Sequence, residues 1–109
     1  MFKTNKEIEM SNFEELIYLV KNWADDKNLL TAGNEHNQIK KVVEEVQEIQ
    51  QALQEGNIED IKNEIGDGFV TLIILAHQVG LTPTDCLLSA YNKISKRKGK
   101  TVNGIFVKD

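Results

Sequence analysis

The chain has 109 residues, of which 40% are hydrophobic and 28% charged, and its net charge is −4. This length predicts one domain with a modest core, and the acidic balance disfavours extensive nucleic-acid binding, which usually needs a basic face. The single cysteine, Cys86, excludes an intrachain disulfide and fits a reducing compartment. No apolar run has the length of a signal peptide or a bilayer span, so we expect a cytoplasmic protein that binds no membrane.

Apolar residues recur at helical spacing in four segments that are separated by turn signals. We expect helices over about 12–27, 35–55, 58–79 and 83–98. Ser11 is the predicted N-cap of the first helix, and Gly56-Asn57 predicts the end of the second helix and the start of the third. Pro83 suits the first turn of the fourth helix.

Beyond the helices, Asn103-Gly104 lies between two short apolar runs and predicts a β-hairpin. We therefore expect a single domain over residues 1–109. Its core would be an all-α bundle of four helices over about 11–98, followed by a short hairpin or extended tail over 99–109.

The predicted helices carry more apolar surface than one small bundle can bury. The second helix has a stripe that we expect to face the core: Ile39, Val42, Val43, Val46, Ile49 and Leu53. The second half of the third helix is apolar nearly all round, which predicts burial on all sides. The fourth helix should face inward with Leu87, Leu88, Ala90, Tyr91 and Ile94. We therefore expect a dimer or a higher oligomer.

Two acidic motifs flank the turn at Gly56, EExxE at 44–48 and ExxD at 64–67. The acids nearest to Gly56 lie eight residues from it on either side, and the next pair lies eleven residues away. If the two helices fold back on each other, these carboxylates come level in two tiers and repel unless a cation neutralises them. Carboxylate oxygens suit Mg²⁺ or Mn²⁺.

The ordinary alternative is that these acids form a solvated helix face, as Glu-rich stretches commonly do. Two observations weigh against it, the symmetry about the turn and the scarcity of balancing bases. Lys62 is the only Lys or Arg between Lys41 and Lys93, whereas a solvated face usually carries interspersed Lys.

Mg²⁺ usually bridges a few carboxylates to substrate phosphates, which links the acids to the basic end of the predicted fourth helix. Lys93 and Arg97, expected one turn apart, would hold phosphate oxygens; the alternative is that they only offset the helix dipole. Trp23, the only tryptophan, either packs in the core or forms a flat wall for a base. His77 has no partner at ligand spacing and is a weak candidate.

The ordered set of motifs resembles the MazG-like members of the all-α NTP pyrophosphatase superfamily. EExxE, a spacer of fifteen residues (49–63) and ExxD carry the resemblance, together with Trp23-Ala24, Gln38 and the basic helix end. The resemblance covers roughly residues 13–98. The ending KGKTVNGIFVKD is also similar to that of short MazG-like proteins of phages and bacteria.

The resemblance implies hydrolysis of a nucleoside triphosphate to the monophosphate and pyrophosphate, as housekeeping of the nucleotide pool. It implies Mg²⁺ ligands, which here are Glu45, Glu48, Glu64 and Asp67. Glu44 would lie in the outer shell or position water. The implied substrate-binding residues are Trp23, Gln38, Lys41, Asn92, Lys93, Lys96 and Arg97.

The resemblance also implies a homodimer or homotetramer. A single domain without a long insertion leaves base selectivity open. The alternatives are a narrow all-α dUTPase or dCTPase, and a non-catalytic helical interaction module whose acids are only a solvated face.

Overall fold

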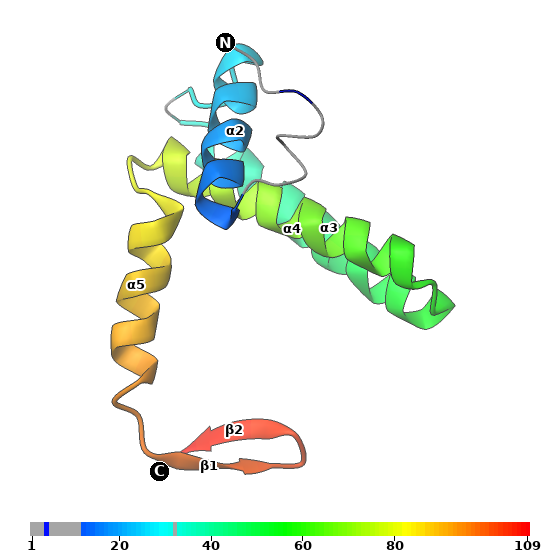
Figure 1. Ribbon diagram of the computed structural model, residues 1–109, viewed down its shortest axis with the longest axis vertical. Coiled ribbons are helices and arrows are strands. Elements are labelled where there is room, and N and C mark those ends of the chain that lie inside the picture. Colours follow the sequence, from blue (N-terminus) through cyan, green and yellow to red (C-terminus); the bar gives the residue numbers. More distant parts are fainter. Residues whose placement is uncertain (1–3, 5–11, 32) are drawn as a thin grey trace.

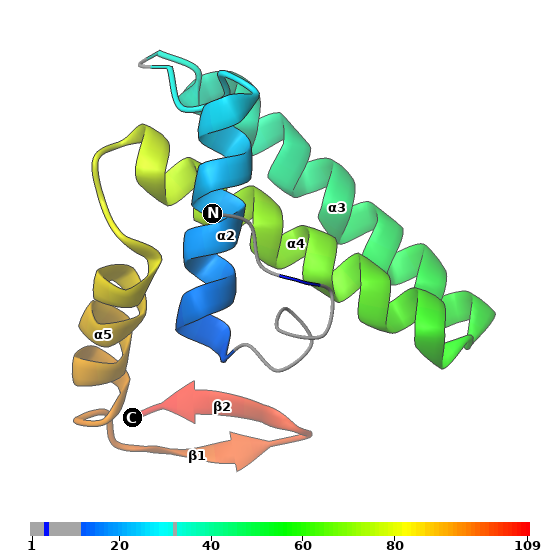
Figure 2. The same cartoon turned by 45° about the horizontal axis from the view of Figure 1, so that its top comes forward.

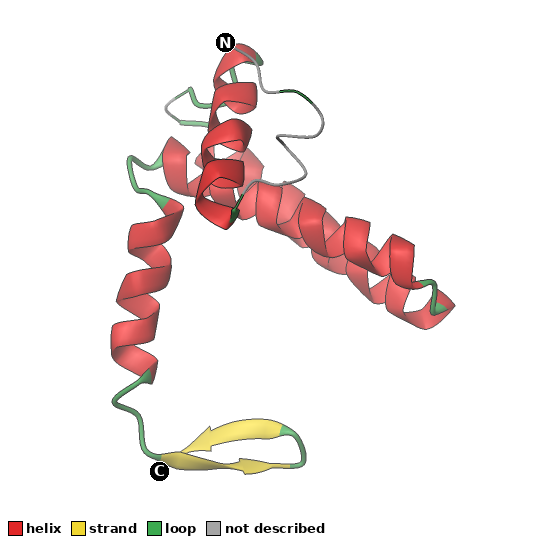
Figure 3. Ribbon diagram, viewed as in Figure 1, coloured by secondary structure: helices red, strands yellow, loops and turns green. Residues whose placement is uncertain are grey.

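The computed structural model describes residue 4, residues 12–31 and residues 33–109, and this part of the chain is mostly helical (Figures 1 and 3). The helices are α2 (Phe13–Asp26), α3 (Glu35–Glu55), α4 (Ile58–Gln78) and α5 (Pro83–Ile94). The strands are β1 (Gly99–Val102) and β2 (Ile105–Lys108), which pair antiparallel. The predicted all-α class with a small hairpin is confirmed.

Local sequence signals set most of the element boundaries. Gly56 ends α3 in the left-handed conformation, with φ 76°, and the Asn57 side chain then accepts hydrogen bonds from the first backbone N–H groups of α4. Asn103 and Gly104 both have positive φ, as the hairpin prediction requires. The cap of α2 is Asn12, which accepts from the backbone N–H of Glu15 at 2.9 Å; the predicted cap, Ser11, lies outside the described residues.

The fourth helix is shorter than predicted. It ends at Ile94 and not at residue 98, because Ser95, Lys96 and Arg97 form tight turns in which each backbone N–H bonds a carbonyl three or four residues back. A continued helix would place Lys96 and Arg97 three and four residues after Lys93, where like charges face each other and disfavour the helix. The expectation that Lys93 and Arg97 lie one helical turn apart is therefore wrong.

The antiparallel pair of α3 and α4 forms the long axis of the helical part (Figure 2). The less exposed side chains of α3 recur at spacings of four and three, which is the period of a coiled-coil seam. They are Gln38, Val42, Glu45, Ile49 and Ala52. The matching positions of α4 include Ile61, Glu64, Gly68 and Thr71. The Gln38 side chain donates to the Thr71 carbonyl across this seam at 3.0 Å.

The predicted core face of α3 is wrong for most of its residues, because a different face of the helix meets α4. Only Val42 and Ile49 of the expected stripe lie in the seam. The other four each directly follow a seam residue, so they point about 100° away from it. Ile39, Val43, Val46 and Leu53 remain 47–58% exposed. The same offset in α4 leaves Ile65, Phe69 and Leu72 exposed.

The small core lies where α2 crosses the second half of α4 (Figure 2). Ile17 and Ala24 of α2 are buried, as are Ile73, Ile74 and Ala76 of α4, which confirms part of the burial expected there. Phe13 meets Phe69 edge to face, with ring centroids 5.6 Å apart.

α5 and the hairpin extend away from this core. None of the residues of α5 is buried, and Leu87, Leu88, Tyr91 and Ile94 are all exposed, so the predicted inward face is wrong within one chain. In both ribbon views the hairpin stands apart from α3 and α4 (Figures 1 and 2).

No single helix in the described residues has the length and apolar character needed to cross a membrane, although α4 and α5 together, bent by 100°, pass the same test.

Candidate metal centre

Three carboxylates meet near the middle of the α3–α4 pair. Glu45 and Glu48 come from α3, and Glu64 comes from α4. One carboxylate oxygen of each lies within 4.8 Å of those of the other two. Oxygens about 2–2.6 Å from one cation are separated by no more than about 5 Å, so this spacing is compatible with one shared ion.

Two of these acids are held in the seam, where water reaches them poorly. Oε2 of Glu45 and Oε2 of Glu64 are both buried and have no hydrogen-bond partner. Burial is the main cause that raises the pKa of Glu45 above its ordinary value, and the negative charges of Glu48 and Asp67 add to it. The main cause that raises the pKa of Glu64 is a hydrogen bond with Glu48, and burial and the same two charges add to it. Ionising both carboxyls is therefore costly without a cation.

The two remaining acids of the motifs behave differently. Asp67 is exposed and is not one of the three carboxylates within 4.8 Å. Its charge nevertheless contributes to the raised pKa of both Glu45 and Glu64, so it faces the same cluster. Glu44 points elsewhere and accepts a hydrogen bond from Lys41 Nζ at 3.2 Å.

The donor set fits a hard divalent cation. In the part of the chain that the structure describes, ion pairs join Lys41 to Glu44, Lys62 to Glu59 and His36 to Glu35, and none reaches the cluster. Buried carboxylate oxygens that lack both a donor and a base are the groups that Mg²⁺ or Mn²⁺ would satisfy. The cluster of Glu45, Glu48 and Glu64, with Asp67 beside it, is called the acidic cluster below.

An apolar groove lies one helical turn along α4 from Asp67. It has a volume of about 380 Å³ and lies between α2 and α4, lined by Leu16, Leu19, Val20, Trp23 and Val70. Val70 follows Asp67 by three residues, so the two lie one turn apart on the same side of α4. Trp23 is half exposed and is not a core residue. Its ring is free to face a flat ligand in this groove.

The other predicted substrate residues do not reach the acidic cluster within one chain. The Gln38 amide is engaged with the Thr71 carbonyl in the seam. Asn92 and Lys93 lie in the last turn of α5, and Lys96 and Arg97 lie just after it; all four are exposed. Figures 1 and 2 show this end of α5 pointing away from α3.

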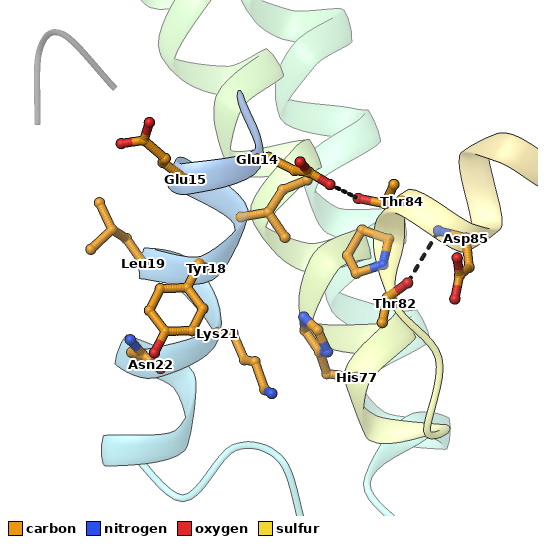
Figure 4. Close-up of a pocket in the computed structure, with 12 residues that line it drawn as sticks. Glu14, Glu15, Tyr18, Leu19, Lys21, Asn22, His77, Thr82, Thr84 and Asp85 are labelled. Carbon is orange, nitrogen blue, oxygen red and sulfur yellow. Dashed lines mark hydrogen bonds between the residues drawn. The ribbon is translucent and has the colours of Figure 1, made fainter. Parts of the chain in front are cut away.

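A second, larger cavity of about 750 Å³ lies between α2 and the start of α5 (Figure 4). Glu14 accepts from the Thr84 hydroxyl at 3.2 Å, so part of its wall serves to join α2 to α5. Burial and the charge of Lys21 lower the pKa of His77, whose Nε2 has no partner among the described residues. Lys21 is distant from His77 in the chain, so sequence spacing could not indicate that the two lie close.

Residues 34–102 match the family model of the MazG nucleotide pyrophosphohydrolase domain. This is more than half of the chain, and it includes the acidic cluster, α5 and β1. The chain therefore belongs to the MazG nucleotide pyrophosphohydrolase domain family, as its motifs indicated. Trp23 and the rest of α2 lie outside the matched segment.

A curated relative is the "Uncharacterized 18.2 kDa protein in rep-hol intergenic region" of Haemophilus phage HP1 (strain HP1c1). It is 35% identical over 69 residues, which are 63% of this chain and 42% of the relative. The match thus spans less than half of the relative's length. No solved structure matches the chain.

Proposed function

We propose that this protein hydrolyses nucleoside triphosphates to nucleoside monophosphates and pyrophosphate with Mg²⁺, or Mn²⁺, at the acidic cluster. The observation that carries the proposal is the meeting of Glu45, Glu48 and Glu64 within 4.8 Å, in a chain whose family is named for nucleotide pyrophosphohydrolysis. In the reaction, water attacks the α-phosphorus and the bond from that phosphorus to the bridging oxygen of the β-phosphate breaks. The oxygen leaves with pyrophosphate.

When bound, the cation would neutralise the triphosphate and make water more acidic. The protein's own contribution is mostly position and field. Glu45 and Glu64, fixed in the seam, would hold the cation at a set depth between the helices. Glu48 and Asp67, which are exposed, would face the substrate side. Glu44, tied to Lys41, would accept a proton from water or order it nearby.

The apolar groove gives the nucleotide a place for its base. Trp23 of α2 and Val70 of α4 line it, and Val70 lies one turn along α4 from Asp67. We expect a base stacked on Trp23 to extend its phosphates toward the cluster. The groove is nearly free of polar groups in its lining, which favours stacking over hydrogen-bond readout of one base. We therefore expect a broad range of nucleotides.

We also propose that the protein is a homodimer or homotetramer. The radius of gyration of one chain is 16.3 Å, whereas a compact chain of this length has about 13 Å. The exposed apolar faces of α3, α4 and α5 supply the surface for assembly.

A panel of ribo- and deoxyribonucleoside triphosphates with Mg²⁺ tests the proposed activity. We expect pyrophosphate from several of them, and a loss of at least about 100-fold in the Glu48→Gln variant. Glu59→Gln is the matched control, because Glu59 is an exposed acid on α4 that pairs with Lys62 at 3.8 Å. Its activity should stay within about twofold of wild type.

The other outcomes separate the alternatives. Turnover of dUTP or dCTP alone would replace the broad activity with a narrow one. No pyrophosphate from any nucleotide would favour a non-catalytic helical module, and equal loss in Glu48→Gln and Glu59→Gln would remove the acidic cluster from the reaction.

A further inference from the structure

The hairpin of β1 and β2 stands apart from α3 and α4 in both ribbon views (Figures 1 and 2). Each strand has four residues, and within the described part of the chain the two strands pair only with each other. Their large apolar side chains have relative exposures of 42–68%: Val102, Ile105, Phe106 and Val107. An isolated two-stranded hairpin is at best marginally stable in water, so a further strand would stabilise it.

The register of the hairpin fixes which backbone groups point to its outer edges. The Asp109 N–H donates to the Lys98 carbonyl at 3.0 Å, which makes these two residues a hydrogen-bonded pair. Such pairs alternate along an antiparallel ladder with pairs whose N–H and C=O groups point outward. With the observed register, the outward groups of β2 belong to Phe106 and Lys108, and Thr101 is a matching position on β1.

The outer edge of β2 lacks the features that usually keep exposed strands apart. Its first three residues, Ile105-Phe106-Val107, form an apolar run without proline or charge. β1 instead carries Lys100 near its start and directly follows Lys98. Because lysine and proline on an edge strand discourage the addition of another strand, β2 is the edge at which we expect a strand to add.

A second copy of β2 is complementary to this edge in one antiparallel register. If a two-fold axis passes beside Val107, the outward groups of Phe106 in each copy meet those of Lys108 in the other. Lys108 then lies opposite the Phe106 ring, which favours a cation–π contact. A register centred on Lys108 would put like charges directly opposite each other. One centred on Phe106 would require Gly104, which has the positive φ of a turn residue, to pair as part of the strand.

We propose that β2 pairs with β2 of a neighbouring copy about this axis, so that two hairpins form one four-stranded sheet. The inference rests on the proposed homodimer or homotetramer and deepens it. Strands of this length bury far less than the about 1,000 Å² of a specific interface, so helical contacts must also hold the copies together. Those contacts present a second β2 at a high local concentration, which favours this occupant over a strand of another protein.

Amide hydrogen exchange, followed by NMR on the wild-type oligomer, tests which edge is paired. In a lone hairpin, the amides of Phe106, Lys108 and Thr101 all point outward and should exchange at similar rates after correction for sequence. Pairing through β2 protects the first two only, and we expect them to exchange at least about tenfold more slowly than Thr101. Similar rates for the three amides, or protection of Thr101 instead, would overturn the proposal.

A disulfide between copies tests the register. Opposed residues at the axis have Cα atoms about 4.5 Å apart, which is within the range that a disulfide spans. In a Cys86→Ser background, which removes the only native thiol, Val107→Cys should give a covalent dimer on mild oxidation. Val102→Cys is the matched control, since Val102 lies on the same face of the hairpin but on β1. It should link at least about tenfold more slowly.

The two results together decide what occupies the edge of β2. Protected β2 amides without a Val107→Cys link, or equal linking of the two variants, would mean that another strand or another register occupies it, and the proposal would fall. Sedimentation of wild type reads the assembly itself. An oligomer without β2 protection would overturn the hairpin pairing and leave the proposed oligomer intact, whereas a monomer would overturn both. None of these measurements uses nucleotide or metal, so their outcome is independent of the proposed activity.

Discussion

At the scale of single residues, Glu45 and Glu64 are the acids of the described chain whose ionised form the surrounding structure disfavours. Each has one buried carboxylate oxygen without a partner, and each has a pKa raised by its surroundings. If these carboxylates only stabilised the fold, we would expect a hydrogen-bond donor or a basic side chain beside their buried oxygens. The unsatisfied pair therefore argues for a ligand that is bound when the protein works.

The raised pKa values predict how the stability of metal-free protein depends on pH. The pKa of Glu45 and of Glu64 in the folded state lies above the ordinary value of 4.5. At a pH between the ordinary and the raised pKa, the folded state therefore binds more protons than the unfolded state. The stability from these groups is complete below about pH 4.5 and is lost as pH rises through the raised pKa values.

The variant Glu45→Gln/Glu64→Gln isolates this effect. In a chelator, its Tm should match that of wild type near pH 4 and exceed it at pH 7, measured by thermal circular dichroism. Millimolar Mg²⁺ should raise the Tm of wild type only, since ligand binding stabilises the state that binds. A variant that is less stable than wild type at pH 7 without metal would show that these carboxylates stabilise the fold.

The residue types of the cluster were predictable, but their exact grouping was not. The spacing about Gly56 paired four acids, and three of them meet within 4.8 Å, while Asp67 stays exposed beside them. The seam explains which two of the acids have a buried carboxylate oxygen. Glu45 and Glu64 occupy seam positions, whereas Glu48 and Asp67 precede the next seam residues, Ile49 and Gly68, and so lie on the solvent side.

At the scale of elements, local signals predicted the helices and the turns better than they predicted the packing. Gly56, Asn57 and Asn103-Gly104 act through backbone conformations and caps that depend on near neighbours only. The choice of packing face depends on the rest of the molecule. α3 has two adjacent apolar faces, and its periodicity alone did not indicate which one meets α4.

Two glycines of α4 provide a test of the seam. Gly66 has no atom within 4 Å of an added Cβ, whereas a Cβ at Gly68 would meet Ile49 Cδ1 at 3.4 Å. Alanine raises helix stability by up to about 1 kcal/mol over glycine. We expect Gly66→Ala to raise the Tm by about 4 °C, and Gly68→Ala to raise it less because Ile49 must shift. A destabilising Gly66→Ala would mean that a second copy or another backbone comes close to Gly66.

At the scale of the whole molecule, the apolar surface that one chain leaves in water supports the proposed assembly. Within the described residues no large side chain is fully buried, and the exposed residues of α3 and α4 that follow the seam lie on one side of the pair. This side is opposite the exposed acids of the cluster, because Glu48 and Asp67 each precede a seam residue on the two antiparallel helices. Assembly through the apolar side would leave the cluster open to substrate.

A single substitution tests assembly through this side. Val46 is 58% exposed on α3, and Val46→Lys would place a charge in the proposed contact. We expect wild type to sediment as a dimer or tetramer, and Val46→Lys to shift to monomer with a lower Tm. Gln47→Lys, the next residue and also exposed, carries the same charge and should leave the assembly unchanged. Wild-type protein that is monomeric at millimolar concentration would contradict the proposed oligomer.

The central claim is tested most directly by identifying the products. The reaction is monitored by ³¹P NMR with a nucleoside triphosphate, Mg²⁺ and water enriched in ¹⁸O. The proposed chemistry predicts nucleoside monophosphate and pyrophosphate as the only products, with the ¹⁸O in the monophosphate because water attacks the α-phosphorus. Glu48→Gln should form both products at least about 100-fold more slowly. Release of orthophosphate with a nucleoside diphosphate, or ¹⁸O found in the pyrophosphate, would contradict the account.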